Sequence, residues 1–182
     1  LNILPPGVER HVVNGGGLTG LQIFPDDEIE IINDEGNQVC EIIVFDKDGK
    51  SEPGILNLKE NLKNSKIKKI LSSKDESCLT ANYQLKKRNL DIGKSKSSLV
   101  FSKDAISGDK INLKSKDKCY VIFSAPGEDM LIHEQNPVTD LTIFIKRAKI
   151  KNDKELSVIP DPVYDPKHEQ NIDRVIKINV IR

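Results

Sequence analysis

The segment that most constrains this chain runs from residue 26 to residue 50, DDEIEIINDEGNQVCEIIVFDKDGK. In its first half, charged residues alternate with isoleucine, which is the period of a half-buried β-strand. The residues NDEG (33–36) follow, and Asn, Asp and Gly favour tight turns. The apolar run QVCEIIVF (38–45) then indicates a second, more deeply buried strand. The pattern predicts a β-hairpin.

The same order of features occurs again later in the chain. SGDKINL (107–113) alternates, SKDK (115–118) has turn composition, and KCYVIFSA (118–125) is an apolar run that contains a cysteine, as the first unit does. We therefore expect a mainly β fold, a barrel or sandwich of two related hairpin units. Strand patterns also occur at residues 8–13, 140–147 and 171–182.

A different pattern interrupts these strands. Residues 53–73 place apolar side chains at helical spacing, so we expect a short helical insertion there, and residues 74–98 predict a long loop with a short strand. We expect residues 1–158 to form the β domain and the proline-rich residues 159–170 to form a linker or arm. Residues 171–182 then form either a terminal strand or the start of a following domain.

Composition excludes several classes of protein. The 28 basic and 28 acidic residues cancel, and Trp is absent, so neither a nucleic acid nor a membrane is expected as a partner. Three widely spaced cysteines form no CxxC motif, which indicates reduced thiols and a cytoplasmic protein. Every apolar run is far shorter than the roughly 20 residues of a membrane helix.

Sequence motifs for catalysis and cofactor binding are weak. Gly15, Gly17 and Gly20 fit G-x-G-x-x-G, but a predicted strand follows where a dinucleotide site needs a helix. The nucleophile motif G-x-S-x-G and the zinc motif H-E-x-x-H are both missing. We therefore predict no catalytic residue and no metal ligand. Glu128 and His133 are candidates only for contacts to a small ligand.

The residues 26–42 resemble a pattern of the urea-carboxylase-associated family and of the N-terminal regions of aminomethyltransferase proteins related to the glycine cleavage T-protein. Residues 107–130, 136–147, 160–166 and 175–182 are similar to the same regions. The cysteine-rich motifs of the stand-alone family are missing. The pattern is matched by Ile29, Ile31, Asp34, Gly36, Gln38, Cys40 and Glu41.

The resemblance implies an N-terminal accessory or substrate-handling domain of a folate-dependent aminomethyltransferase in one-carbon metabolism. The catalytic part and a candidate cofactor, tetrahydrofolate, would belong to the full-length protein, whose C-terminal domains would be partners of this one. A small-molecule-binding or metal-dependent protein and a non-catalytic interaction module are the alternatives. The candidate ligand-binding residues are Gln38, Cys40, Glu41, Glu128 and His133. Equally, Gln38 and Glu41 are expected to fix the turn and the strand pairing.

Overall fold

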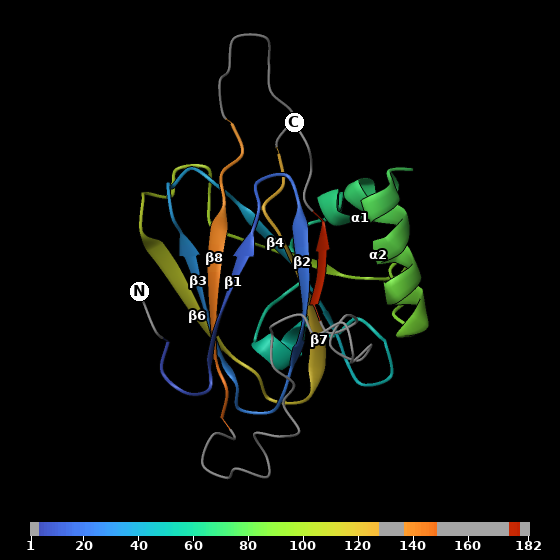
Figure 1. Ribbon diagram of the computed structural model, residues 1–182, viewed down its shortest axis with the longest axis horizontal. Helices are drawn as coiled ribbons and strands as arrows, with labels where there is room; N and C mark the ends of the chain where they lie inside the picture. The colour runs from blue at the N-terminus through green and yellow to red at the C-terminus, as the bar shows by residue number, and fades with distance from the viewer. Residues whose placement is uncertain (1–3, 128–136, 149–174, 179–182) are drawn as a thin grey trace.

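The computed structural model describes residues 4–127, 137–148 and 175–178, and it contains two antiparallel β-sheets with helices on one side (Figure 1). The four-stranded sheet has the order β1 (Val8–Val13), β8 (Leu141–Lys146), β3 (Glu28–Asn33) and β6 (Asp109–Lys114). The five-stranded sheet has the order β5 (Ser97–Val100), β4 (Cys40–Phe45), β7 (Cys119–Ser124), β2 (Leu18–Ile23) and β9 (Val175–Ile178). The predicted mainly β sandwich is confirmed.

The predicted hairpins are wrong, because each apolar strand lies in the other sheet from the alternating strand before it. β3 pairs with β6 and β8, whereas β4 pairs with β5 and β7. The NDEG turn, with Gly36 at φ +81° and Asn37 at φ 57°, therefore carries the chain across the sandwich. A turn between sheets uses the same residues as a hairpin turn, so local composition does not separate the two.

The two related units pair with each other rather than folding separately. Antiparallel pairing joins β3 to β6 in one sheet and β4 to β7 in the other. Burial explains this arrangement. The alternating strand β6 keeps one face in solvent, while every residue of β4 and β7 is buried. The apolar strands therefore occupy the interior of the sheet that the helices cover.

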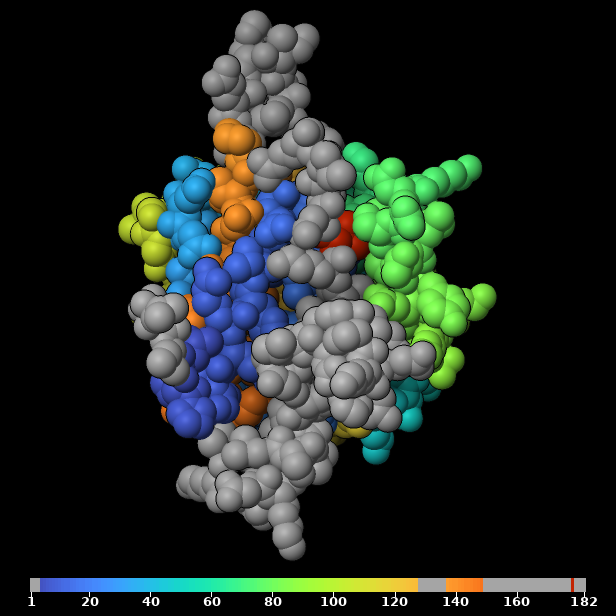
Figure 2. Space-filling view, in the orientation of Figure 1, coloured from blue at the N-terminus to red at the C-terminus, as the bar shows by residue number. Residues whose placement is uncertain are grey.

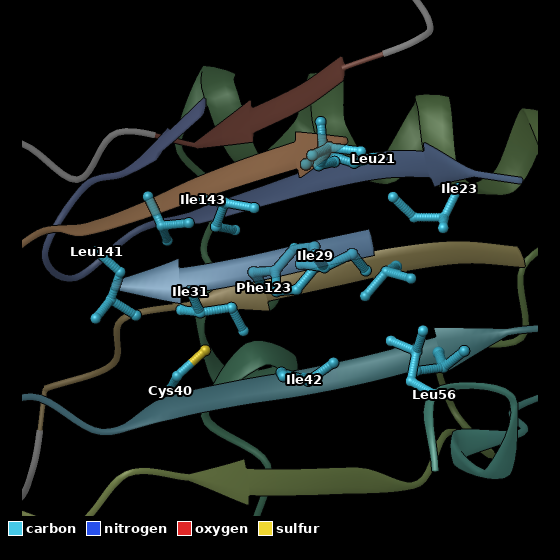
Figure 3. Close-up of a cluster of buried hydrophobic side chains, with 14 of the residues drawn as sticks. Leu21, Ile23, Ile29, Ile31, Cys40, Ile42, Leu56, Phe123, Leu141 and Ile143 are labelled. Atoms are coloured by element: carbon cyan, nitrogen blue, oxygen red, sulfur yellow. The ribbon is translucent and has the colours of Figure 1, made fainter. Parts of the chain in front are cut away.

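Side chains from both sheets form the core between them (Figure 3). Ile31 and Ile143 of the four-stranded sheet face Cys40, Ile42 and Phe123 of the five-stranded sheet in this core. The opposite face of β4 and β7 is covered by helices, and this second cluster includes Ile43, Phe45, Ile122, Ile67, Leu71, Cys78, Ala81 and Leu85. A three-layer arrangement thus explains why both strands are apolar at successive positions.

The helical insertion is longer than the sequence predicts. A 3₁₀-helix η1 (Pro53–Leu56) and a short helix α1 (Lys66–Leu71) lie in the expected segment. The predicted loop at 74–98 is wrong, because α2 (Glu76–Lys87) occupies part of it. Cys78, Ala81 and Leu85 form its buried stripe, but Leu79 and Tyr83 are exposed and obscure the pattern. Figure 2 shows α1 and α2 along one side of the molecule, next to β9.

The glycine-rich segment leads into strand β2, as expected, and not into a helix. β2 pairs with β9, and a Cβ atom at Gly17 would lie 2.0 Å from the carbonyl oxygen of Ile178. Glycine is therefore required here for close strand packing. Residues 175–178 belong to the five-stranded sheet, while the proline-rich segment 159–170 lies outside the described residues. In the described part of the chain, no helix is long and apolar enough to cross a membrane.

The packing of the core predicts that two phenylalanines contribute differently to the free energy of unfolding. Phe123 is 0% exposed between the sheets, whereas Phe144 of β8 is only partly buried. Phe123→Ala should lower the free energy of unfolding by about 3–5 kcal/mol because it leaves a cavity. Phe144→Ala, the matched control, should lower it by about 1 kcal/mol. Urea denaturation measures both values, and equal losses would contradict this account of the core.

Candidate functional site

The strongest sequence candidates lie where the inter-sheet turn enters β4. Gln38 is 3% exposed, and Cys40 and Glu41 are 0% exposed. Cys40 points into the core between the sheets (Figure 3), and Glu41 points to the opposite face of β4. The three side chains therefore do not converge on one cavity. Glu128 and His133 lie outside the described residues.

Gln38 joins the turn to two other segments. Its Nε2 atom donates to the carbonyl oxygens of Val39 (2.8 Å) and Pro126 (2.9 Å), and its Oε1 atom accepts from the backbone N–H of Thr139 (2.9 Å). Its own carbonyl oxygen accepts from Asn33 Nδ2 at 2.6 Å. Both amide protons and the amide oxygen are thus used within the protein, which indicates a structural role.

Glu41 holds the N-terminus of α1 against the sheet. Its Oε1 atom accepts from the backbone N–H groups of Lys66 (2.7 Å) and Ile67 (3.1 Å). Its Oε2 atom accepts from the hydroxyl groups of Ser65 (2.5 Å) and Ser97 (2.8 Å). An ionised carboxylate offers roughly four acceptor positions, so all are filled. The negative charge is also favourable beside a helix N-terminus. No acceptor position is left for a ligand.

The two strand cysteines are buried and chemically inert. Burial raises the pKa of the Cys40 thiol well above its ordinary value, and the neighbouring charge of Glu41 raises it further. Burial also raises the pKa of Cys119, from 9.0 to about 11, although a hydrogen bond with Ser115 opposes the shift. Both groups are protonated thiols at neutral pH, and the thiolate is the reactive form. Their burial agrees with the apolar strand segments in which both cysteines lie.

A buried ionic cluster was missed by sequence reasoning. Arg147, just after β8, donates from Nε to Glu9 Oε2 (2.8 Å) and from Nη1 to Asp27 Oδ2 (2.7 Å). His11 Nε2 lies 3.0 Å from Glu9 Oε1. All four side chains are at most 9% exposed. Only Glu9 and His11 are close in sequence, while Asp27 and Arg147 come from distant segments, so no local signal identifies the cluster.

The chemistry of this cluster is that of a structural ion pair. Burial by itself lowers the pKa of Arg147, but hydrogen bonds and charges from Glu9 and then Asp27 raise it above the ordinary value. Asp27 also accepts from the backbone N–H groups of Phe24 (2.8 Å) and Ala148 (3.0 Å). The cluster thus ties β1, the turn before β3 and the end of β8 together. Arg147 is thus paired with two carboxylates inside the protein.

A partly enclosed cavity of about 260 Å³ lies between the turn after β4, the start of β7 and the end of α2. Its charged lining residues are Asp46, Lys47, Arg88 and Lys118, and Tyr120 forms part of its wall. We call it the Arg88 pocket. Among the described residues, no group of three or more His, Cys, Asp or Glu side chains is placed to hold a metal ion. The Arg88 pocket is a candidate for binding a ligand because several charged side chains line it.

The chain folds as a β-sandwich in which the two related units pair with each other. The hydrogen bonds between Glu41 and the N-terminus of α1 and the ionic cluster around Arg147 stabilise it. No protein-family model matches the chain. The chain is similar to trimethylamine-oxide aldolase of Ruegeria pomeroyi, with 33% identity over 163 residues. These residues are 90% of this chain and 20% of the relative, so the chain spans about a fifth of the length of the curated relative it matches.

This similarity corrects the resemblance inferred from residues 26–42. The relative is an aldolase, which is a lyase, and neither an aminomethyltransferase nor a urea-carboxylase-associated protein is shown. The interpretation as an accessory domain of a folate-dependent aminomethyltransferase is therefore wrong. The short pattern consists of turn residues and buried strand residues, whose roles here are structural. Such residues are a weak guide to chemistry. Tetrahydrofolate as a cofactor of the full-length protein stays a prediction.

The hydrogen bonds of Glu41 predict how strongly this side chain stabilises the fold. Glu41→Ala removes the acceptors of two backbone N–H groups and two hydroxyl groups, so it should lower the free energy of unfolding by about 2–4 kcal/mol. Glu60→Ala, at an exposed position, is the matched control and should change it by less than about 0.5 kcal/mol. Chemical denaturation measures both. A stable Glu41→Ala variant would instead favour a ligand-binding role.

The pKa of Cys119 predicts how stability changes at alkaline pH. Its folded pKa of about 11 exceeds the ordinary value of 9.0, so its contribution is fully present below pH 9.0. Between these values the unfolded thiol ionises first, and the free energy of unfolding should fall by about 1.4 kcal/mol per pH unit from this group. Cys119→Ala should show a shallower decline than the wild type in denaturation series from pH 8 to about pH 11. Identical slopes would contradict the assignment.

Proposed function

We propose that the protein to which this chain belongs is a lyase that cleaves trimethylamine oxide or a closely related amine oxide. The observation that carries this proposal is the 33% identity to trimethylamine-oxide aldolase over 90% of the chain. A similarity that extends over nearly the whole chain involves both sheets and the helical layer, so it reflects more than one shared motif.

The chemistry of such a cleavage is balanced without an external oxidant. An aldolase releases a carbonyl compound, and formaldehyde and dimethylamine together contain every atom of trimethylamine oxide. One carbon–nitrogen bond and the nitrogen–oxygen bond break, and the released methyl carbon ends bonded to oxygen. The carbon is oxidised while the nitrogen is reduced, so electrons balance within the substrate. One proton moves from that carbon to the amine nitrogen.

Within this lyase, we assign the described residues a supporting role. Gln38 forms hydrogen bonds at the turn, and Glu41 forms hydrogen bonds with α1. Cys40 is a protonated thiol in the core. Arg147 forms ion pairs with Glu9 and Asp27 inside the fold. These interactions favour a rigid β-sandwich that supports the remaining polypeptide, which we expect to be its main partner. A small-molecule ligand is a further candidate partner.

An assay of the full-length protein tests this function. The purified protein, with and without added divalent metal ions, should release formaldehyde and dimethylamine from trimethylamine oxide in equal amounts. Formaldehyde is measured with a colorimetric reagent and dimethylamine by chromatography. Trimethylamine, which lacks the oxygen atom, is the matched control substrate and should give neither product. A folded full-length protein that releases no formaldehyde under any of these conditions would refute the proposal.

A further inference from the structure

We infer that the Arg88 pocket binds a small multivalent oxyanion, a phosphate or a dicarboxylate. The charge of the cavity lining points to this ligand class, because Lys47, Arg88 and Lys118 line the cavity against one carboxylate, Asp46. The whole chain has a net charge of zero, so this excess of positive charge is local. A concave basic site concentrates anions by focusing the electrostatic potential.

Arg88 is the residue that makes the pocket more than a group of surface lysines. Its guanidinium carbon lies 4.6 Å from the centroid of the Tyr120 ring, which restricts the position of the side chain. Its Nε atom is buried and has no hydrogen-bond partner. A buried donor without a partner is unfavourable. The planar guanidinium suits two-point binding of a carboxylate or phosphate.

Asp46 competes with an anionic ligand only in part. Its Oδ1 atom accepts from the backbone N–H groups of Asp48 (2.9 Å) and Lys50 (3.0 Å), so this oxygen is occupied by the turn. Within the described part of the chain, Lys47 and Lys118 form no ion pair. Lys118 Nζ lies 6.0 Å from the centroid of the Phe24 ring. Both ammonium groups are therefore available to a ligand.

The walls of the pocket are fixed by backbone contacts. The turn after β4 lies beside the end of α2 (Figure 1), and Asp91 N donates to Gly49 O at 3.1 Å. A Cβ atom at Gly49 would lie 2.0 Å from the carbonyl oxygen of Asn89, so these segments are in close contact. On the opposite wall, Gln22 Nε2 donates to Cys119 O at 2.7 Å. The site is thus preformed, which reduces the entropy lost on binding.

The contents of the pocket favour binding rather than reaction. Cys119 is the one thiol among the lining residues, and it is 1% exposed and protonated at neutral pH. The volume of about 260 Å³ is below the roughly 300–1,000 Å³ of pockets for drug-sized ligands. A small anion therefore fits better than a nucleotide or a peptide. This site is independent of the amine-oxide cleavage proposed above.

Isothermal titration calorimetry on the full-length protein tests the inference. Inorganic phosphate and succinate are titrated separately at constant ionic strength, with sodium chloride as the reference salt. At least one anion should bind, and Arg88→Gln and Lys118→Gln should each weaken it by about tenfold. The matched controls Lys86→Gln and Lys116→Gln remove the same charge from exposed positions of the same segments and should leave affinity unchanged. The anion that binds more tightly shows whether the ligand of this pocket carries a phosphate or two carboxylates.

Two results would overturn the inference. One is the absence of binding by both anions to the wild-type protein at millimolar concentration. The other is a loss of affinity in Arg88→Gln and Lys118→Gln no greater than in the two controls. Circular dichroism establishes that each variant is folded. If Arg88→Gln fails to fold because it loses the contact with Tyr120, Lys118→Gln decides the test, because the Lys118 side chain is exposed.

Discussion

The burial of β4 and β7 on both faces is the constraint on which the rest of this structure depends. Cys40, Ile42 and Val44 face one cluster, while Ile43 and Phe45 face the other. A strand of this kind requires a second sheet on one side and helices on the other. The crossing turns, the place of β3 and β6 in the other sheet and the packing of α1 and α2 all follow from that requirement.

The same constraint explains why the candidate residues at the start of β4 are structural. Glu41 lies on a strand without a solvent-exposed face, and a buried carboxylate needs hydrogen bonds or an opposite charge. The N-terminus of α1, with Ser65 and Ser97, supplies four hydrogen bonds. The arrangement that suggests a binding site in the sequence is thus the means by which α1 is held against the sheet.

The described part of the chain thus combines an interior whose polar side chains are mostly hydrogen-bonded with a basic surface pocket. The buried polar side chains at Gln38, Glu41 and Arg147 form hydrogen bonds within the fold. Arg88 Nε and Asn33 Oδ1 differ, because these buried atoms have no hydrogen-bond partner. Amine-oxide cleavage is a proposal for the whole protein. This chain covers about a fifth of the length of its relative. Anion binding is a proposal for this chain's own residues.

The sequence by itself determined the strands, the mainly β class and the buried state of Cys40 and Cys119, because alternation and apolar runs are local properties. It did not determine that β3 and β4 lie in different sheets, since turn composition is the same in both cases. Nor did it reveal α2, whose buried stripe is short, or the partners of Arg147, which lie 120 and 138 residues away. Strand pairing and charge pairing join residues distant in sequence, so only the tertiary structure decided them.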